Sequence, residues 1–198
     1  MSPVQIAIIG AGLIGRRHAD AVSNSNQPAV AGIVDPSDEA QQFAREQSYE
    51  WFPDLAEMLA SRRPDGAIIA TPNQLHLPLG LEALRENIPV LIEKPLADSV
   101  QSAQQLVDQS DAMDTPLLVG HHRRHNPIIM AAKEKITDGL LGDIVAVNGM
   151  CWLYKPADYF ETKWRTRKGA GPVYINLIHD VDLLRHLIGE IVTVEAFE

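Results

Sequence analysis

A glycine-rich turn between an apolar strand and a helix constrains this chain more than any other feature. Apart from Gln5, residues 4–9 are apolar and rich in β-branched side chains, which predicts a strand buried on both faces. Gly10-Ala11-Gly12-Leu13-Ile14-Gly15 follows, and a helix is predicted over 13–22. Such spacing allows a tight turn, close approach of a ligand to the backbone, and close packing of helix on strand. The helix start favours phosphate, so the turn predicts a bound dinucleotide.

Strands and helices alternate along the chain to about residue 120. Further strands are predicted over 29–34, 66–70, 89–92 and 117–119, with a short strand or turn at 50–53. This alternation is typical of the α/β class, with a doubly wound parallel sheet covered by helices on both faces. Helix caps are predicted at Ser37 or Asp38, at Asp54 and at Ser99. We therefore expect residues 1–120 to form a Rossmann domain, which binds ligands beyond the carboxyl ends of its strands.

The composition argues against several classes of function. The 198 residues carry a formal net charge of −9, so the chain has no general attraction for nucleic acid or anionic membranes. Cys151 is the only cysteine, which excludes an intrachain disulfide and a cysteine-rich metal site. No apolar stretch approaches the roughly 20 residues that span a bilayer, and the N-terminus lacks a basic signal region. We expect a cytoplasmic protein without nucleic-acid or membrane partners.

Asp35 ends the second predicted strand, about 20 residues beyond the glycines. A carboxylate at this place accepts hydrogen bonds from the adenosine ribose and repels a 2′-phosphate, so NAD is favoured over NADP. A simple turn before Pro36 is the alternative, and Ser37 could accommodate a phosphate.

The pattern changes after residue 120. Helices are predicted over 126–137 and 174–187, strands over 144–152 and 191–197, and a long loop over 155–171. Two strands and two helices make a thin domain. We therefore expect residues 121–198 to be part of a larger α/β domain.

Four motifs in this order make the chain resemble the glucose–fructose oxidoreductase / inositol dehydrogenase (Gfo/Idh/MocA) family. They are Gly10-x-Gly12-x-x-Gly15-x-x-His18, Ala70-Thr71-Pro72-Asn73-x-x-His76, Glu93-Lys94-Pro95, and Gly169-x-Gly171 followed by His179-x-x-Asp182. The resemblance implies a Rossmann domain followed by an α/β domain with an open, mainly antiparallel sheet. That sheet often joins subunits, so a homo-oligomer, a dimer or tetramer, is expected.

The resemblance also implies roles for the strand-end motifs. Thr71-Pro72-Asn73 would line the cofactor, Glu93 would lie near the nicotinamide ribose, and Lys94 would point at the substrate hydroxyl. A lysine at such a strand end can stabilise alkoxide charge, and a cis peptide before Pro95 would aim it inward. His76 is grouped with the cofactor residues, with packing on its helix as the alternative. The predicted cofactor contacts are Gly10, Gly12, Leu13, Ile14, Gly15, Asp35, Thr71, Pro72, Asn73, His76, Glu93 and Lys94.

His179 is the predicted general base, because a near-neutral imidazole can take the hydroxyl proton as the hydride leaves. Asn176 and Asp182 are three residues away on either side and share its helix face. Members of the family commonly carry an Asp four residues before this His, where the chain has Ile175. Asn176 is therefore predicted to position the reacting group. A core histidine satisfied by its neighbours is the alternative.

Cationic and aromatic residues supply the remaining substrate predictions. Arg124, in the run from Gly120 to Pro127, best fits a family position that frames nicotinamide and substrate. Its charge favours a substrate with a carboxylate or many hydroxyls. A metal there is disfavoured, because adjacent His121 and His122 point apart. The aromatic and cationic residues of the loop are predicted to bind sugar faces, with interface packing as an equal alternative; they are Tyr154, Lys155, Tyr159, Trp164 and Arg165. The predicted substrate contacts are Lys94, Arg124, Tyr154, Trp164, Arg165, Asn176 and His179.

These features and the resemblance predict an NAD(P)-dependent oxidoreductase, with NAD favoured over NADP, that moves a hydride between the cofactor and a secondary alcohol of a sugar, inositol or related polyol. Lys94 and His179 are predicted to flank the substrate hydroxyl. Two alternatives stay open: an NAD-dependent glycosidase of the same family, and a non-catalytic NAD-binding sensor.

Overall fold

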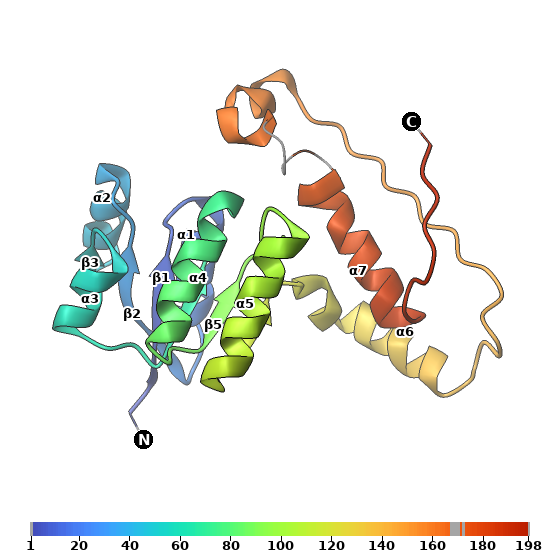
Figure 1. Cartoon of the computed structure of the whole chain (residues 1–198), viewed down its shortest axis with the longest axis horizontal. Helices are drawn as coiled ribbons and strands as arrows, with labels where there is room; N and C mark the ends of the chain where they lie inside the picture. Colours follow the sequence, from blue (N-terminus) through green and yellow to red (C-terminus); the bar gives the residue numbers. More distant parts are fainter. Residues whose placement is uncertain (1, 167–170, 172, 198) are drawn as a thin grey trace. The chain divides into compact units, whose positions relative to one another are not determined.

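A computed structural model describes residues 2–166, 171 and 173–197, and the chain divides into two compact units (Figure 1). The first unit ends at Gly120 and the second begins at His121. Gly169 of the predicted glycine pair lies outside the described residues. Within the described ranges, no helix is long and apolar enough to cross a membrane.

The first unit is built on one sheet of six parallel strands, in the order β3-β2-β1-β4-β5-β6. The strands are β1 (Val4–Ile9), β2 (Pro28–Val34), β3 (Trp51–Phe52), β4 (Gly66–Ile69), β5 (Val90–Ile92) and β6 (Leu117–Val119). The predicted parallel α/β sheet is confirmed. The chain order reverses between β1 and β4, and in such sheets this switch point is where ligands bind.

Five α-helices and one short 3₁₀ turn connect these strands (Figure 1). They are α1 (Leu13–Ser23), α2 (Asp38–Glu46), α3 (Leu55–Ser61), η1 (Asn73–Leu75), α4 (His76–Arg85) and α5 (Val100–Met113). The predicted caps are confirmed, because Ser37, Asp54 and Ser99 each accept a backbone N–H three residues further on. Each such cap stabilises its helix by about 1 kcal/mol.

The core of the first unit lies on both faces of the sheet. Ala7 and Ile9 of β1 pack into a cluster that includes buried residues of α3, α4 and α5. Ile8 points to the opposite face, where it packs with buried residues of α1 and α2. This alternation follows from the two-residue period of a strand. Burial on both faces explains why β1 is an almost continuous apolar run.

The second unit has two longer helices, α6 (Pro127–Thr137) and α7 (Ile178–Leu187). Asn126 caps α6, and Pro127 occupies the first helical position, where its missing N–H has no consequence. The helix predicted over 174–187 is shorter than expected. Its first turn, η5 (Val173–Leu177), is π-helical. The described residues of this unit also form three 3₁₀ segments: η2 (His122–His125), η3 (Ala157–Glu161) and η4 (Lys163–Thr166).

The strands predicted over 144–152 and 191–197 are not formed in the described part of the second unit. Both segments carry exposed apolar side chains, among them Val145, Trp152, Val192 and Phe197. A strand is stable only when its backbone groups pair with a neighbour, and no ladder reaches these segments among the described residues. The structure therefore does not show the predicted antiparallel sheet.

Candidate functional site

The glycine turn between β1 and α1 leaves little room at two positions and ample room at a third. Gly10 has φ +92°, and a Cβ there would lie 2.9 Å from the main chain of Ala70. A Cβ on Gly15 would lie 1.8 Å from the Gly10 carbonyl oxygen. Nothing lies within 4 Å of the place a Cβ would occupy on Gly12. Close packing therefore requires glycine at two positions, and Gly12 leaves the backbone open to a ligand.

Asp35 fixes the shape of this turn from the end of β2. Its Oδ2 accepts the Ala11 amide at 2.8 Å, and its Oδ1 accepts the Ser37 amide at 2.9 Å and hydroxyl at 2.6 Å. The predicted acid thus stands beside the glycines. A pocket of about 570 Å³ opens here, lined by Ile9, Gly10, Gly12, Val34, Asp35, Pro36, Pro53, Asp54, Leu55, Ala70, Thr71, Pro72, Leu75, Pro78 and Leu79.

The pocket fits the adenosine and diphosphate parts of a dinucleotide. Its walls are mainly apolar, as an adenine ring requires, and Asp35 supplies a carboxylate for ribose hydroxyls. Gly12 is the N-cap of α1 and has no side chain to cap the helix. The first amides of α1 are therefore available to phosphate oxygens. The Thr71 hydroxyl is buried without a hydrogen-bond partner in the described structure, so it is available to a polar atom of a ligand.

A buried histidine contacts the main chain of the loop after β4. His76 is 1% exposed, and its Nε2 lies 2.9 Å from the Thr71 carbonyl oxygen. Its Nδ1 lies 2.9 Å from the Pro95 carbonyl oxygen. Thr71 and Pro72 line the pocket, and Asn73 is buried at the start of η1. Both His76 nitrogens thus face main-chain groups of the protein, which makes His76 a support of this loop.

The loop after β5 carries Glu93, Lys94 and Pro95. The Lys94–Pro95 peptide is cis, as expected. The Glu93 carboxylate accepts the Lys94 amide at 3.1 Å through Oε2. It also pairs with His18, whose Nε2 lies 2.8 Å from Oε1. The lysine turn is thereby tied to α1, the helix that follows the glycine turn.

The charge of Glu93 is maintained in spite of its position. Burial by itself raises the pKa of this carboxyl. The hydrogen bond and charge of His18, the Lys94 amide and the Lys94 charge act in the opposite direction, and the pKa ends below its usual value. A Cβ on Gly120 would lie 3.1 Å from the carboxyl group, so a glycine at the end of β6 leaves room for Glu93.

In the second unit, the turn η2 contacts α7 through three consecutive residues. The ring of His122 meets the ring of His179 edge-on, with centroids 4.9 Å apart. Arg123 pairs with Asp180 at 2.8 Å. Arg124 makes a two-pronged pair with Asp182, at 2.9 and 2.6 Å. The predicted base, His179, is only 7% exposed and is thus held by both its own helix and this turn.

The Arg124 guanidinium neutralises a carboxylate of α7 in this structure. Asp182 is 5% exposed, and a buried carboxylate needs a partner. Burial raises the pKa of Asp182, whereas the Arg124 hydrogen bonds and the His121 charge lower it, and the pKa ends below its usual value. Sequence reasoning placed Arg124 on the substrate and did not detect this pair. The structure gives that arginine a structural partner, because its fork matches the carboxylate geometry.

Replacing Arg124 by Ala is expected to destabilise the protein by about 2 kcal/mol at neutral pH, because it strands the Asp182 charge in the interior. With Arg124 present, the Asp182 pKa lies below its usual value, so the pair contributes stability above the unfolded-state pKa and loses it as pH falls through the folded-state pKa. The deficit of the variant therefore shrinks as the pH is lowered from neutral to below about 4. Urea unfolding at two pH values measures this. Arg124→Ala combined with Asp182→Asn should recover most of the loss, and an equal loss at both pH values would contradict the argument.

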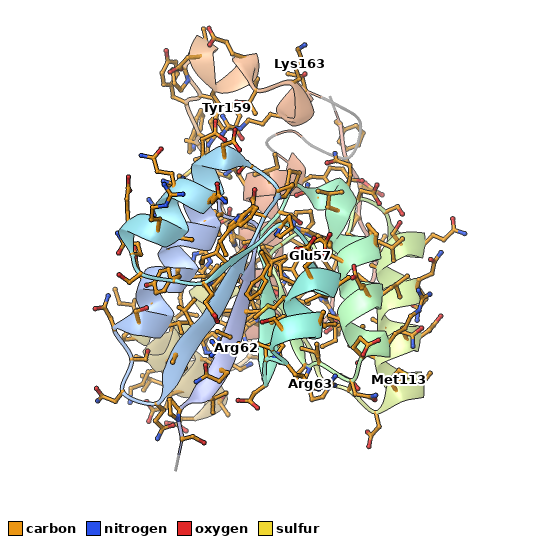
Figure 2. The ribbon with its side chains drawn as sticks, turned by 90° about the vertical axis from the view of Figure 1, so that its left-hand side faces the viewer. Glu57, Arg62, Arg63, Met113, Tyr159 and Lys163 are labelled. Carbon is orange, nitrogen blue, oxygen red and sulfur yellow. The ribbon has the colours of Figure 1, made fainter. Side chains whose placement is uncertain are left out.

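The other residues predicted to bind substrate in the second unit do not take part in the contacts between η2 and α7. Asn176 lies in the π-helical turn before α7, and its side-chain oxygen is buried without a hydrogen-bond partner in the described region. Tyr154 is exposed. Tyr159 lies on the same loop as Lys163 (Figure 2). The side chain of the predicted contact Trp164 lies outside the described part of the structure.

Two cations stack on one aromatic ring of this loop. Lys155 lies 4.6 Å and Arg165 4.2 Å from the Tyr159 ring centroid. Arg165 also donates to the Tyr159 carbonyl at 2.9 Å. These contacts give the loop internal support, and the two roles predicted for it, sugar binding and interface packing, both stay predictions. Among the residues described, no group of three His, Cys, Asp or Glu side chains has the arrangement of a metal site.

Comparisons with known proteins decide the family. The profile described as "Oxidoreductase family, NAD-binding Rossmann fold" (GFO_IDH_MocA) matches residues 4–121, and the "GFO/IDH/MocA C-terminal domain" matches residues 129–198. This chain belongs to the Gfo/Idh/MocA family. Its first unit is therefore the NAD-binding Rossmann domain of that family, and the predicted resemblance is confirmed.

Three relatives illustrate the place of the chain within the Gfo/Idh/MocA family. It is 33% identical to an inositol 2-dehydrogenase of Rubrobacter xylanophilus, with 94% of this chain and 53% of the relative aligned. It is 26% identical to the rhizopine catabolism protein MocA of Rhizobium meliloti, covering 96% and 59%. The crystal structure of the Bordetella pertussis WlbA dehydrogenase with NADH and UDP-GlcNAcA matches with a TM-score of 0.84 and 25% identity, covering 95% and 56%. The chain thus spans between half and three fifths of the length of these relatives.

Two contacts that support predicted site residues, one in each unit of this Gfo/Idh/MocA chain, were not predicted from the sequence. The first is His18, which pairs with Glu93 across 75 positions of the chain. Its position three residues after Gly15 places it on the same face of α1 as that glycine, and this was the available signal. The second is the edge-on contact between the rings of His122 and His179. The only signal for it in the sequence was the run of histidines after Gly120.

Proposed function

We propose that this chain contains the cofactor site and catalytic residues of an NAD-dependent dehydrogenase that oxidises a secondary alcohol of a sugar, inositol or related polyol. The observation that supports this most strongly is the pocket at the switch point of the sheet. There an open Gly12, the Asp35 carboxylate and the unpartnered Thr71 hydroxyl meet. The inositol 2-dehydrogenase among its relatives favours the polyol class.

Residues 1–120 are assigned to dinucleotide binding, with Gly10, Gly12, Leu13, Ile14 and Gly15 at the diphosphate. Asp35 is assigned to the adenosine ribose. Two carboxylate oxygens beside that sugar repel a 2′-phosphate, so NAD is preferred over NADP. Thr71, Pro72, Asn73 and Glu93 are assigned to the remaining cofactor contacts, with Glu93 near the nicotinamide ribose.

Two residues are assigned to the reaction. NAD, held by the residues assigned above, would supply the acceptor for the hydride of the carbinol carbon. Lys94 donates a hydrogen bond from its ammonium group to the substrate oxygen and stabilises negative charge on it. His179 takes the hydroxyl proton as neutral imidazole. Asn176 orients the substrate through its buried side-chain oxygen, in place of an ionisable group at position 175.

Residues 121–198 are assigned to a substrate and oligomerisation domain. Segments 144–152 and 191–197 are proposed as strands of an open, mainly antiparallel sheet that also joins copies of the protein. Their exposed apolar side chains support this, because such faces are normally covered. The single cysteine supports a cytoplasmic location.

The test has a binding arm and a turnover arm. We expect NADH, followed by its fluorescence, to bind at least tenfold more tightly than NADPH. We expect NADH formation with at least one member of a panel of inositols, sugars and sugar acids. Binding without turnover would favour the sensor, and release of free sugar from a glycoside without net NADH would favour the glycosidase. Failure to bind NADH would contradict the proposal.

A further inference from the structure

His76 is a buried titratable residue to which the proposed reaction gives no part. It is the first residue of α4 and lies at the sheet edge where β4 and β5 end. Its two ring nitrogens reach two different loops, at 2.9 Å each. One is the Thr71 carbonyl, on the wall of the pocket. The other is the Pro95 carbonyl, next to Lys94.

These two carbonyls belong to the two loops that the proposed function uses most. The β4 loop carries Thr71 and Pro72 on the pocket wall. The β5 loop carries Lys94. The pair between Glu93 of this loop and His18 connects the loop to α1. A rigid ring between the loops restricts both their separation and the orientation of the peptide that follows Lys94.

We propose that His76 is a positioning residue, whose ring sets the spacing between the Thr71 loop and the Lys94–Pro95 turn. Through Thr71 it shapes the cofactor pocket, and through Pro95 it determines where Lys94 is held. This inference rests on the proposed function, which assigns cofactor binding to the Thr71 loop and catalysis to Lys94. The contacts of His76 with the two loops do not depend on that function.

The protonation of His76 explains why the two links can be separated. Burial lowers its pKa, and the hydrogen bonds to Pro95 and Thr71 only partly oppose this. At neutral pH the ring is therefore neutral and donates through one nitrogen at a time. A side chain with one donor at either nitrogen position can keep one link and lose the other.

Two amide variants make this separation. The Asn amide nitrogen stands near the Nδ1 position, so His76→Asn keeps a donor for Pro95 and loses the one for Thr71. The Gln amide nitrogen reaches the Nε2 position, so His76→Gln keeps the donor for Thr71 and loses the one for Pro95. Gln101→Ala, at an exposed position of α5, is the control. Thermal unfolding shows whether each variant is folded.

Two readouts follow the two loops in the protein without substrate. The NADH dissociation constant reports the Thr71 loop. The rate of Lys94 acetylation by acetic anhydride, measured by peptide mass spectrometry against the exposed Lys135, reports the lysine turn. We expect His76→Asn to weaken NADH binding fivefold to tenfold and to leave Lys94 labelling within twofold. We expect His76→Gln to accelerate Lys94 labelling at least threefold and to leave NADH binding within twofold.

A histidine with a merely structural role would not produce this pattern, in which each variant changes a different readout. If both variants change both readouts by similar factors, or if neither variant changes either readout, the positioning role is overturned. If the unmodified protein binds no NADH, the proposed function fails. The labelling arm, which uses no NADH, still decides the Pro95 half of the inference.

Discussion

Replacing Lys94 by Ala is expected to lower kcat by about three orders of magnitude and to leave the NADH dissociation constant within twofold. Loss of one charge-stabilising donor from an oxyanion site costs on the order of 10²–10³ in rate, and the lysine is the cation that the proposal places at the reacting oxygen. The side chain follows β5, whereas the diphosphate turn follows β1, so cofactor binding should be spared. NADH formation with a substrate from the polyol panel measures the first quantity, and NADH fluorescence measures the second.

Two further variants separate charge from position in this prediction. Lys94→Arg keeps the charge but places a planar group where an ammonium was, so most of the rate should still be lost. Lys135→Ala removes an exposed lysine of α6 and should leave both quantities unchanged. Near-normal turnover of the Ala variant would remove Lys94 from the mechanism.

The first unit was predictable because its signals are local and repeated. The apolar run of β1, the glycine turn and the helix caps at Ser37, Asp54 and Ser99 each favour the same parallel fold. The strand-end motifs then fall at one edge of the sheet, because parallel strands all end there. Asp35, Thr71 and Gly12 meet at one pocket for this reason.

The contacts that were not predictable join residues far apart in the chain. His18 and Glu93 meet only after α1 packs on the sheet, and neither residue type names its partner. The pair of Arg124 with the buried Asp182, 58 positions later, is a second such contact. The predicted contact of Arg124 with substrate stays a prediction. The segments 144–152 and 191–197 have strand-like patterns, but a pattern cannot supply the partner strand that makes a ladder.

Replacing Gly15 by Ala is expected to weaken NADH binding by more than 100-fold and to lower the stability of the protein by about 2 kcal/mol. The added methyl would lie 1.8 Å from the Gly10 carbonyl oxygen, and neither atom belongs to a flexible side chain. The turn or α1 must therefore shift. Because Gly10 itself is confined by Ala70 and Thr71, the shift spreads to the wall of the pocket. Urea unfolding and NADH fluorescence measure the two effects.

Replacing Gly12 by Ala is the matched comparison, because the same methyl group there meets no atom within 4 Å. The residue has φ −68°, which alanine adopts without strain, so the free energy of unfolding should change by less than about 0.5 kcal/mol. NADH binding should nevertheless weaken at least tenfold, because the methyl would stand where a diphosphate approaches the first amides of α1. A Gly12 variant that binds NADH normally would show that the open surface beside α1 is not the diphosphate site. A loss of stability as large as that of the Gly15 variant would show that the turn is confined at this position as well.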